Sequence, residues 1–413
     1  MERTYVLSCR LIVLIFKFAF TFIAAKILTT SDFSEYIVLA SLIVFSVYFV
    51  GLDFYSFSNR ELVSESKEKQ NHNIKNHGFV IFIMYVVFGT VVFFTPGDII
   101  GPEVKLYFFI ISIGEHFSLE VSRILNIKEC FVKSATLMIL KVVPWILSII
   151  VMHYIFDVHL ELTDILLAWS LTSILLMFFS LLFLSKTYSL LAIFREKISV
   201  PLIIRGLKVC SLFLVGTLAV KGLFTYDKQM LKMASTAEYI VLYGIIWSAI
   251  NAVVAMIESG VIVFKYPRII AACKAKDLRM VTSYVKELVC VILCIYFVFY
   301  ILFYLYGSRL LDEYIFSGKQ LDLDSFPIVF SILCIGSLFN SLSNVPHYII
   351  YGVAKYDRFL LNVNLSVFSA FAVAAYCLRE YENGVAISLA SSFGALFLIK
   401  SYKAAVICNE DLS

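Results

Sequence analysis

Long apolar stretches separated by short polar segments run through the whole chain. We place twelve of them, at residues 11–29, 34–54, 77–95, 106–125, 134–154, 163–185, 207–226, 237–263, 285–306, 326–350, 359–378 and 384–402. Each is close to the roughly 20 residues that an α-helix needs to cross a bilayer. Because a helix satisfies its own backbone hydrogen bonds in lipid, the pattern predicts an all-α polytopic membrane protein with about twelve spans and with both termini on one side.

The composition excludes the other broad classes of protein. Hydrophobic residues make up 61% of the 413 residues and charged residues only 15%, whereas soluble domains carry about 25% charged residues. The 38 Phe and 24 Tyr exclude a disordered chain. None of the nine cysteines lies well inside a predicted external loop or stands with His or carboxylates at metal-ligand spacing. We therefore expect no disulfide framework, no metal site and no cofactor.

Lysine and arginine are distributed unevenly over the predicted loops. Of the 34 basic residues, 24 lie on one side, in the N-terminus, 56–76, 123–133, 186–208, 265–286, 353–358 and the tail with Lys400 and Lys403. Seven lie on the other side, at Lys26, Lys105, Lys228, Lys232, Arg309, Lys319 and Arg379. Basic loops stay in the cytoplasm, so both termini are predicted to be cytoplasmic. The net charge of +4 then reflects topology, and we expect membrane lipids rather than nucleic acid as partners.

A short repeat indicates a duplicated architecture. The sequence Glu-Tyr-Ile-Val-Leu occurs at 35–39 and again at 238–242, at the start of the second and eighth predicted spans. A chance identity of five residues in an apolar chain is the alternative. Equivalent positions in two six-span halves favour duplication, which is common in transporters. We predict an N-terminal half at 1–200 and a C-terminal half at 201–413, forming two pseudo-symmetric six-helix bundles around a central cavity.

Several local segments resemble one known family. The second span opens at Tyr36 and ends in Gly51-Leu52-Asp53-Phe54, the segment Ser58-Asn59-Arg60 follows, and the seventh span ends in Tyr226-Asp227-Lys228. These segments, with the span number and the two-half layout, resemble the Wzx-type O-antigen flippases. That group is the polysaccharide-transport branch of the superfamily that also holds the MATE multidrug exporters and the lipid II flippases.

This resemblance implies a function, a location and partners. It implies a flippase that carries an undecaprenyl-pyrophosphate-linked oligosaccharide, such as an O-antigen repeat unit, by alternating access. The direction would be from the cytoplasmic to the periplasmic leaflet of a bacterial inner membrane. A lipid-linked oligosaccharide would be the substrate, in the context of lipopolysaccharide biosynthesis. A polysaccharide polymerase and a chain-length regulator would be candidate protein partners.

Three lysines lie well inside predicted spans, at Lys17, Lys141 and Lys221. Ionisable residues at this depth are costly and normally face the protein interior or water. An anionic pyrophosphate crossing a low-dielectric region needs such positive charge, so we predict that the three lysines bind substrate in a cationic cavity. The alternatives are snorkelling of the ammonium toward an interface and pairing with a buried carboxylate.

The fourth span carries a polar face. Ser112, His116, Glu120 and Arg123 share one side of the helix, and Glu115 lies on a neighbouring stripe. We consider Glu115, His116 and Glu120 candidates for a cavity that couples transport to a proton or cation. Alternatively, Glu120 forms an intrahelical ion pair with Arg123, and His116 is a hydrogen-bonded packing residue.

The second half contains two comparable stripes. In the tenth span Asn340, Asn344 and His347 follow helical spacing, and the eighth span carries Asn251 and Glu258. Amide side chains suit sugar hydroxyls, since they donate and accept hydrogen bonds at once. They serve equally well as hydrogen-bonding contacts between helices.

Two other functions compete with a flippase. A membrane-embedded polysaccharide polymerase would also be polytopic, but the longest predicted external loop, about 307–325, is rich in acidic residues, and no catalytic motif is present. We therefore expect no enzyme activity. A MATE-like drug or metabolite antiporter is the second competitor, although three lysines inside the membrane are unfavourable for cationic drugs.

Overall fold

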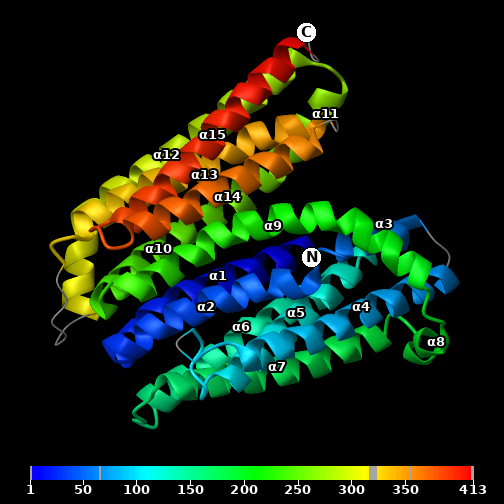
Figure 1. The fold of residues 1–413 in the computed structure, drawn as a ribbon, viewed down its shortest axis with the longest axis horizontal. Helices are drawn as coiled ribbons and strands as arrows, with labels where there is room; N and C mark the ends of the chain where they lie inside the picture. Colours follow the sequence, from blue (N-terminus) through cyan, green and yellow to red (C-terminus); the bar gives the residue numbers. More distant parts are fainter. Residues whose placement is uncertain (1, 65–66, 98, 316–322, 354–355, 411–413) are drawn as a thin grey trace. The chain divides into compact units, whose positions relative to one another are not determined.

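The computed structural model describes residues 2–64, 67–97, 99–315, 323–353 and 356–410, and every regular element in these ranges is helical (Figure 1). The first helices are α1 (Glu2–Ile27), α2 (Thr30–Gly51), α3 (Tyr55–Ser64), α4 (Lys67–Phe94), α5 (Lys105–Ile127), α6 (Phe131–Tyr154), α7 (Leu162–Ser185), α8 (Leu190–Arg195) and α9 (Val200–Ala234). They are followed by α10 (Ala237–Ile257), the π-helix η1 (Glu258–Ile262), α11 (Val263–Lys274), α12 (Leu278–Leu310), the π-helix η2 (Leu311–Ile315), α13 (Phe326–Gly352), α14 (Asp357–Leu378) and α15 (Gly384–Glu410).

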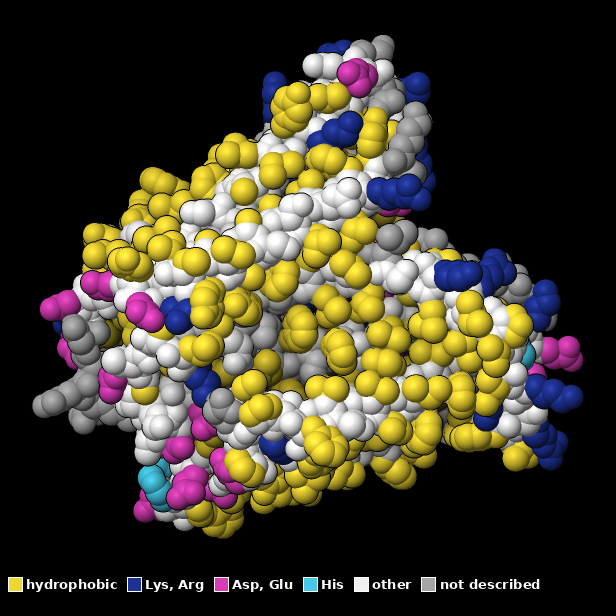
Figure 2. Space-filling model, viewed as in Figure 1, with side chains coloured by type: hydrophobic (Ala, Val, Ile, Leu, Met, Phe, Trp, Pro, Cys, Tyr) yellow, Lys and Arg dark blue, Asp and Glu magenta, His cyan; other side chains and the backbone are white. Residues whose placement is uncertain are grey.

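The helices confirm the predicted fold class. Within the described ranges, ten helical segments are long and apolar enough to cross a membrane, and α9 becomes an eleventh if its two parts, which meet at a 45° bend, form one span. The one predicted span that is not among these is the fourth, at 106–125, which corresponds to α5. Its 23 residues extend about 34 Å at 1.5 Å per residue. It fails a simple hydropathy criterion because it carries Glu115, Glu120 and Arg123. Large apolar side chains cover the visible flanks of the helices, as a lipid-facing surface requires (Figure 2).

The chain forms two compact units. Unit 1 contains the chain up to Phe20 together with Ile27–Leu218, and unit 2 contains Thr21–Lys26 together with the chain from Ala219 onward. Helices α1 and α9 therefore contribute to both units. The division into halves at 1–200 and 201–413 stays a prediction.

Threonine caps begin the two helices that carry the repeated sequence. The hydroxyl of Thr29 accepts a hydrogen bond of 3.1 Å from the backbone N–H of Asp32 at the start of α2. The hydroxyl of Thr236 accepts one of 3.4 Å from the backbone N–H of Tyr239 at the start of α10. A threonine at this position satisfies one of the free N–H groups of the first turn. The repeated sequence nevertheless starts at different points of the two helices, at the sixth residue of α2 and at the second residue of α10.

Unit 1 is organised around α5, which packs against α2, α4, α6 and α7. At Gly114 the backbone of α5 comes so near α7 that an added Cβ would lie 2.7 Å from the Cβ of Ser173. Buried apolar residues fill the end of the unit near α8: Leu62, Ile74, Val121, Ile124, Leu125, Leu137, Leu176, Leu184, Tyr188 and Ile193. The polar residues of α5 are therefore enclosed by other helices rather than by lipid.

Unit 2 is organised in the same manner around α13, which packs against α10, α11, α12, α14 and α15 (Figure 1). At Gly336 an added Cβ would lie 2.8 Å from the Cα of Ala390 in α15. Further along, the rings of Phe339 and Phe397 are 5.8 Å apart. Because the residue numbers rise together in both helices, α13 and α15 run parallel.

Candidate functional site

The predicted polar face of α5 is buried in unit 1. Ser112 and His116 have no exposed surface and Glu120 has 3%. The hydroxyl of Ser46, in α2, donates a hydrogen bond of 2.8 Å to the hydroxyl of Ser112. The spacing of four residues thus brings these side chains to one side of α5, where α2 and α4 cover them.

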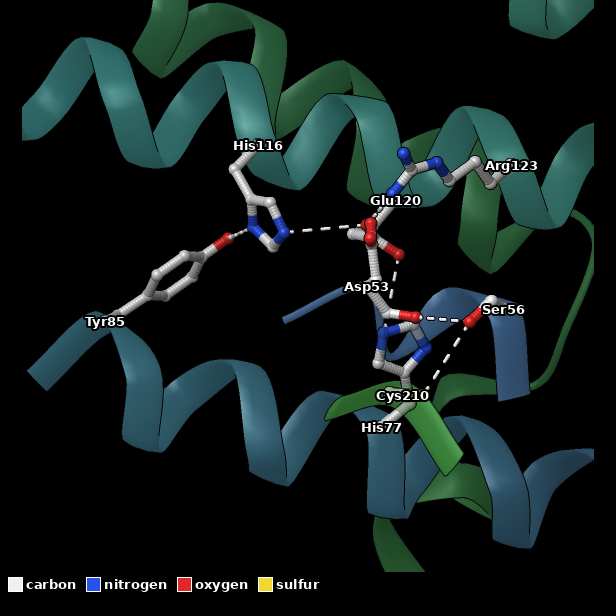
Figure 3. A network of polar contacts seen from close by, with 8 residues as sticks. All are labelled: Asp53, Ser56, His77, Tyr85, His116, Glu120, Arg123 and Cys210. Atoms are coloured by element: carbon white, nitrogen blue, oxygen red, sulfur yellow. Dashed lines mark hydrogen bonds and ion pairs between the residues drawn. The ribbon is translucent and has the colours of Figure 1, made fainter. Parts of the chain in front are cut away.

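Glu120 lies at the centre of a network that we call the Glu120 cluster: Tyr85, His77, His116, Glu120 and Arg123 (Figure 3). Nδ1 of His116 is 3.0 Å from the hydroxyl of Tyr85, and its Nε2 is 3.5 Å from Oε1 of Glu120. Nε2 of His77 is 3.4 Å from Oε2 of Glu120. Arg123 donates a hydrogen bond to the same carboxylate. One carboxylate is therefore shared by an arginine and two imidazoles from two different helices.

The Glu120 cluster combines a permanent positive charge with two buried imidazoles and a buried carboxylate. The guanidinium of Arg123 also lies 3.4 Å from the centroid of the Tyr55 ring, which fixes one permanent positive charge beside Glu120. Nε2 of His77, Nε2 of His116 and Oε2 of Glu120 are buried without a hydrogen-bond partner among the described residues. A proton on Nε2 of either imidazole would thus lie beside the carboxylate of Glu120. The predicted pairing of Glu120 with Arg123 does form, and the two imidazoles lie close to the same carboxylate.

Glu115 anchors a second group, the Lys17–Lys141–Glu115 cluster. Nζ of Lys141 is 2.7 Å from Oε2 of Glu115, and Nε1 of Trp169 donates a hydrogen bond of 3.0 Å to Oε1. Lys17, on α1, interacts electrostatically with both Lys141 and Glu115, and its side chain is exposed. Three helices therefore bring two lysines and one carboxylate within electrostatic reach of one another.

Unit 2 places Lys221 and Glu258 within electrostatic reach of each other. Glu258 is exposed and opens the π-helix η1, an irregularity that is frequent at functional sites. Asn251 is exposed on α10, two turns before it. The formal charges of Lys221 and Glu258 are opposite and equal, so this pair adds no net charge to unit 2.

The polar stripe of α13 is only half-buried. Asn340, Asn344 and His347 all have intermediate exposure. The ring of His347 lies 5.7 Å from that of Tyr348 and 6.4 Å from that of Tyr351. The stripe is therefore an amide-rich and aromatic surface of the kind that we expected for sugar contacts.

Sequence reasoning missed several polar residues. It assigned Lys228 to an external loop, but α9 continues to Ala234 and buries Lys228 against Asp227, with Nζ 2.9 Å from Oδ2. The hydroxyl of Tyr243 donates a hydrogen bond of 2.7 Å to the same carboxylate. It assigned Lys400 to the tail, whereas Lys400 lies within α15 and is buried. Helix length beyond the apolar stretch was the missing information for Lys228, whereas Lys400 lies inside the predicted span 384–402 and only its burial was missed.

Solved structures resemble this chain throughout its length. An inward-facing multidrug-resistance MATE transporter of the MOP superfamily matches with a TM-score of 0.75 and 10% identity, over 98% of this chain and 99% of the other. An outward-facing MATE transporter of the same superfamily matches with a TM-score of 0.63 and 12% identity, over 99% and 97%.

A third similar structure is a MOP superfamily transporter from Pyrococcus furiosus, described as having a binding pocket of reverse polarity that suggests a different function. It matches with a TM-score of 0.52 and 11% identity, over 99% of this chain and 94% of the other. No protein-family model and no curated protein sequence matches the chain. The chain therefore has the fold of the MATE transporters, with two pseudo-symmetric helical bundles.

Proposed function

We propose that this chain is an alternating-access transporter that moves a lipid-linked oligosaccharide from the cytoplasmic to the outer leaflet of a bacterial inner membrane. Similarity to both inward-facing and outward-facing MATE structures supports the alternating-access part. The Lys17–Lys141–Glu115 cluster carries the substrate part. Its two lysines within predicted spans suit a pyrophosphate, which loses hydration on leaving water.

The charges of the cluster divide into two roles. Glu115 offsets Lys141 at 2.7 Å, which compensates a half-buried ammonium and a buried carboxylate. Lys17 is the exposed member and is the residue we assign to the pyrophosphate. Lys141 then positions Glu115 and raises the local positive potential.

The amide stripe of α13 would meet the sugar part of the same substrate. Asn340 and Asn344 have the donor and acceptor groups that sugar hydroxyls need, and both retain accessible surface. A polysaccharide polymerase and a chain-length regulator remain candidate protein partners under this proposal.

A MATE-like antiporter is the second candidate, and it fits the fold at least as well. The Glu120 cluster favours it, because a buried carboxylate beside two imidazoles is suited to proton coupling. In the similar structure from the same superfamily, a binding pocket of reverse polarity suggests a different function. We therefore use the charge of the pocket to distinguish the two candidates. Both share one transport cycle and differ in the charge of the substrate.

Purified full-length protein in proteoliposomes with an imposed pH gradient separates them. One arm follows translocation of an undecaprenyl-pyrophosphate-linked oligosaccharide with a fluorescent sugar, quenched by a membrane-impermeant reductant. The other follows uptake of the cationic dye ethidium. We expect translocation of the lipid-linked sugar without dye uptake. Dye uptake without translocation of the lipid-linked sugar would contradict the flippase proposal and support the antiporter.

A further inference from the structure

Lys400 is a buried cation that the proposed mechanism does not use. It lies on α15, about 24 Å from the start of that helix at 1.5 Å per residue. The residue is only 6% exposed. If α15 begins at the outer boundary of a hydrocarbon core about 30 Å thick, Lys400 approaches the level of the phosphates in the cytoplasmic leaflet.

Lys400 differs from the other enclosed lysines in having no counter-charge. Lys228, which is equally buried, contacts both oxygens of Asp227, and Lys141 contacts Glu115. Among the described residues, neither an ion pair nor a hydrogen bond engages the ammonium of Lys400, and no carboxylate acts on it electrostatically. An ammonium taken from water without compensation is costly, so an external anion is the missing partner.

The imidazole of His347 lies within electrostatic reach of Lys400. Helices α13 and α15 pack against each other, and Lys400 on α15 is the charged group that acts electrostatically on the imidazole of His347 on α13. His347 makes ring contacts with Tyr348 and Tyr351 but no hydrogen bond with any described residue. Its ring N–H is thus available to the same ligand as the ammonium.

The surroundings favour an anion. Helix α11 packs against α13, and α11 with the turn that follows carries Arg268, Lys274 and Lys276 as exposed cations. Figure 2 shows Lys and Arg side chains gathered at this end of unit 2, near α11 and the end of α15. The positive potential of this end would draw an anion toward Lys400.

We propose that Lys400 and His347 form a binding site for a phosphate-bearing anion in unit 2. The ammonium supplies the charge and the imidazole supplies a directional N–H donor. The ligand is either the phosphate of an anionic lipid headgroup or a free phosphate or pyrophosphate. The site is separate from the Lys17–Lys141–Glu115 cluster, and it stands whether the transported molecule is an oligosaccharide lipid or a cation.

Two binding measurements on the full-length protein test the site and distinguish the sources. The first is a calorimetric titration of inorganic pyrophosphate into protein held in nanodiscs of pure phosphatidylcholine. The second is native mass spectrometry of detergent-purified protein with added phosphatidylglycerol. We expect Lys400→Met to weaken binding about tenfold, or about 1.4 kcal/mol, in at least one of the two measurements. His347→Gln should weaken the same binding to a smaller extent.

The variants are matched so that folding does not obscure the result. Lys403→Met, which removes the same charge one turn further along α15, should leave binding unchanged, because Lys403 instead lies 4.1 Å from the centroid of the Tyr356 ring. Lys400→Met should melt at or above the wild-type temperature, since methionine removes an uncompensated charge at nearly the same volume. If that variant does not fold, His347→Gln decides the question.

Each outcome is decisive. Loss of pyrophosphate binding identifies a free phosphate group as the ligand, and loss of the phosphatidylglycerol adducts alone identifies a lipid headgroup. Unchanged binding in both measurements overturns the site, as does absence of either anion from the wild-type protein. A lower melting temperature of Lys400→Met with unchanged anion binding would show that the lysine is purely structural.

Discussion

Lys141 is the residue at which sequence and structure can be compared most directly. Sequence reasoning allowed either a substrate-binding lysine or a lysine paired with a buried carboxylate. The structure provides the carboxylate, since Nζ of Lys141 is 2.7 Å from Oε2 of Glu115. Pairing does not by itself exclude a role in transport, so the two effects must be separated by experiment.

A double-mutant cycle separates them. Lys141→Met alone removes the direct ion-pair partner of Glu115, whose side chain is 10% exposed, and leaves only the electrostatic interaction with Lys17; it should destabilise the protein by about 1–3 kcal/mol. Lys141→Met combined with Glu115→Gln should restore most of that loss, because neither charge remains. Thermal unfolding of the detergent-purified variants measures both. If the double variant is as unstable as Lys141→Met, the ion pair is not what the lysine contributes.

The Glu120 cluster shows what a single sequence can and cannot supply for a site. Helical spacing correctly predicted that Ser112, His116 and Glu120 share one buried face of α5. It did not identify His77 or Tyr85, which meet that face from α4. Spacing describes one helix at a time, whereas the choice of partner residues depends on how two helices pack.

Close approach of helices is the main feature at the scale of the elements. Gly114 brings α5 against Ser173 of α7, and Gly336 brings α13 against Ala390 of α15. These are the fourth and sixth predicted spans in one half and the tenth and twelfth in the other. Small residues at such contacts allow helices in lipid to pack by van der Waals contact where no hydrophobic effect drives them together.

Adding one methyl group at this contact tests its importance. Gly336→Ala would place a Cβ 2.8 Å from the backbone of Ala390, so we expect α13 and α15 to separate at a cost of about 1–3 kcal/mol. Gly394→Ala on α15 is the matched control, since its Cβ would lie 3.7 Å from the ring of Phe339, an ordinary contact distance. Melting temperatures in detergent should fall for the first variant only. Equal melting temperatures for both would contradict the close packing.

The elements were predicted well in position and less well at their ends. Apolar stretches located the spans because a helix in lipid must be apolar where it meets lipid. They could not locate the end of α9, which continues past its apolar stretch and buries Lys228, and they could not show that Lys400, inside the predicted span 384–402, is buried. They also could not show that the polar helix α5 is enclosed by its neighbours, because enclosure is a property of the whole unit.

Membrane orientation belongs to the scale of the whole molecule. The uneven distribution of basic residues predicts cytoplasmic termini. A fluorescent protein that folds only in the cytoplasm should therefore fluoresce when fused after Ser413. Alkaline phosphatase, which is active only outside the cytoplasm, should be active when inserted at His159, between α6 and α7. The opposite pattern of activities would reverse the orientation, and with it the proposed direction of transport.

The fold does not identify the substrate. Identities of 10–12% to the similar MATE and MOP structures leave the chemistry of the site to this chain's own residues. Those residues combine two lysines, Lys17 and Lys141, near one carboxylate with a buried carboxylate and two imidazoles at Glu120. An anionic substrate carried by a proton-coupled cycle is consistent with both features.

Translocation of the fluorescent lipid-linked oligosaccharide by Lys17→Met proteoliposomes tests the central claim most directly. We predict a rate at least about tenfold below wild type, substantial activity in Lys17→Arg and full activity in the control Lys26→Met, which removes a lysine from the same helix. The reason is that a positive charge at position 17 compensates the pyrophosphate as it loses water. Full-rate translocation by Lys17→Met combined with Lys141→Met would contradict the claim.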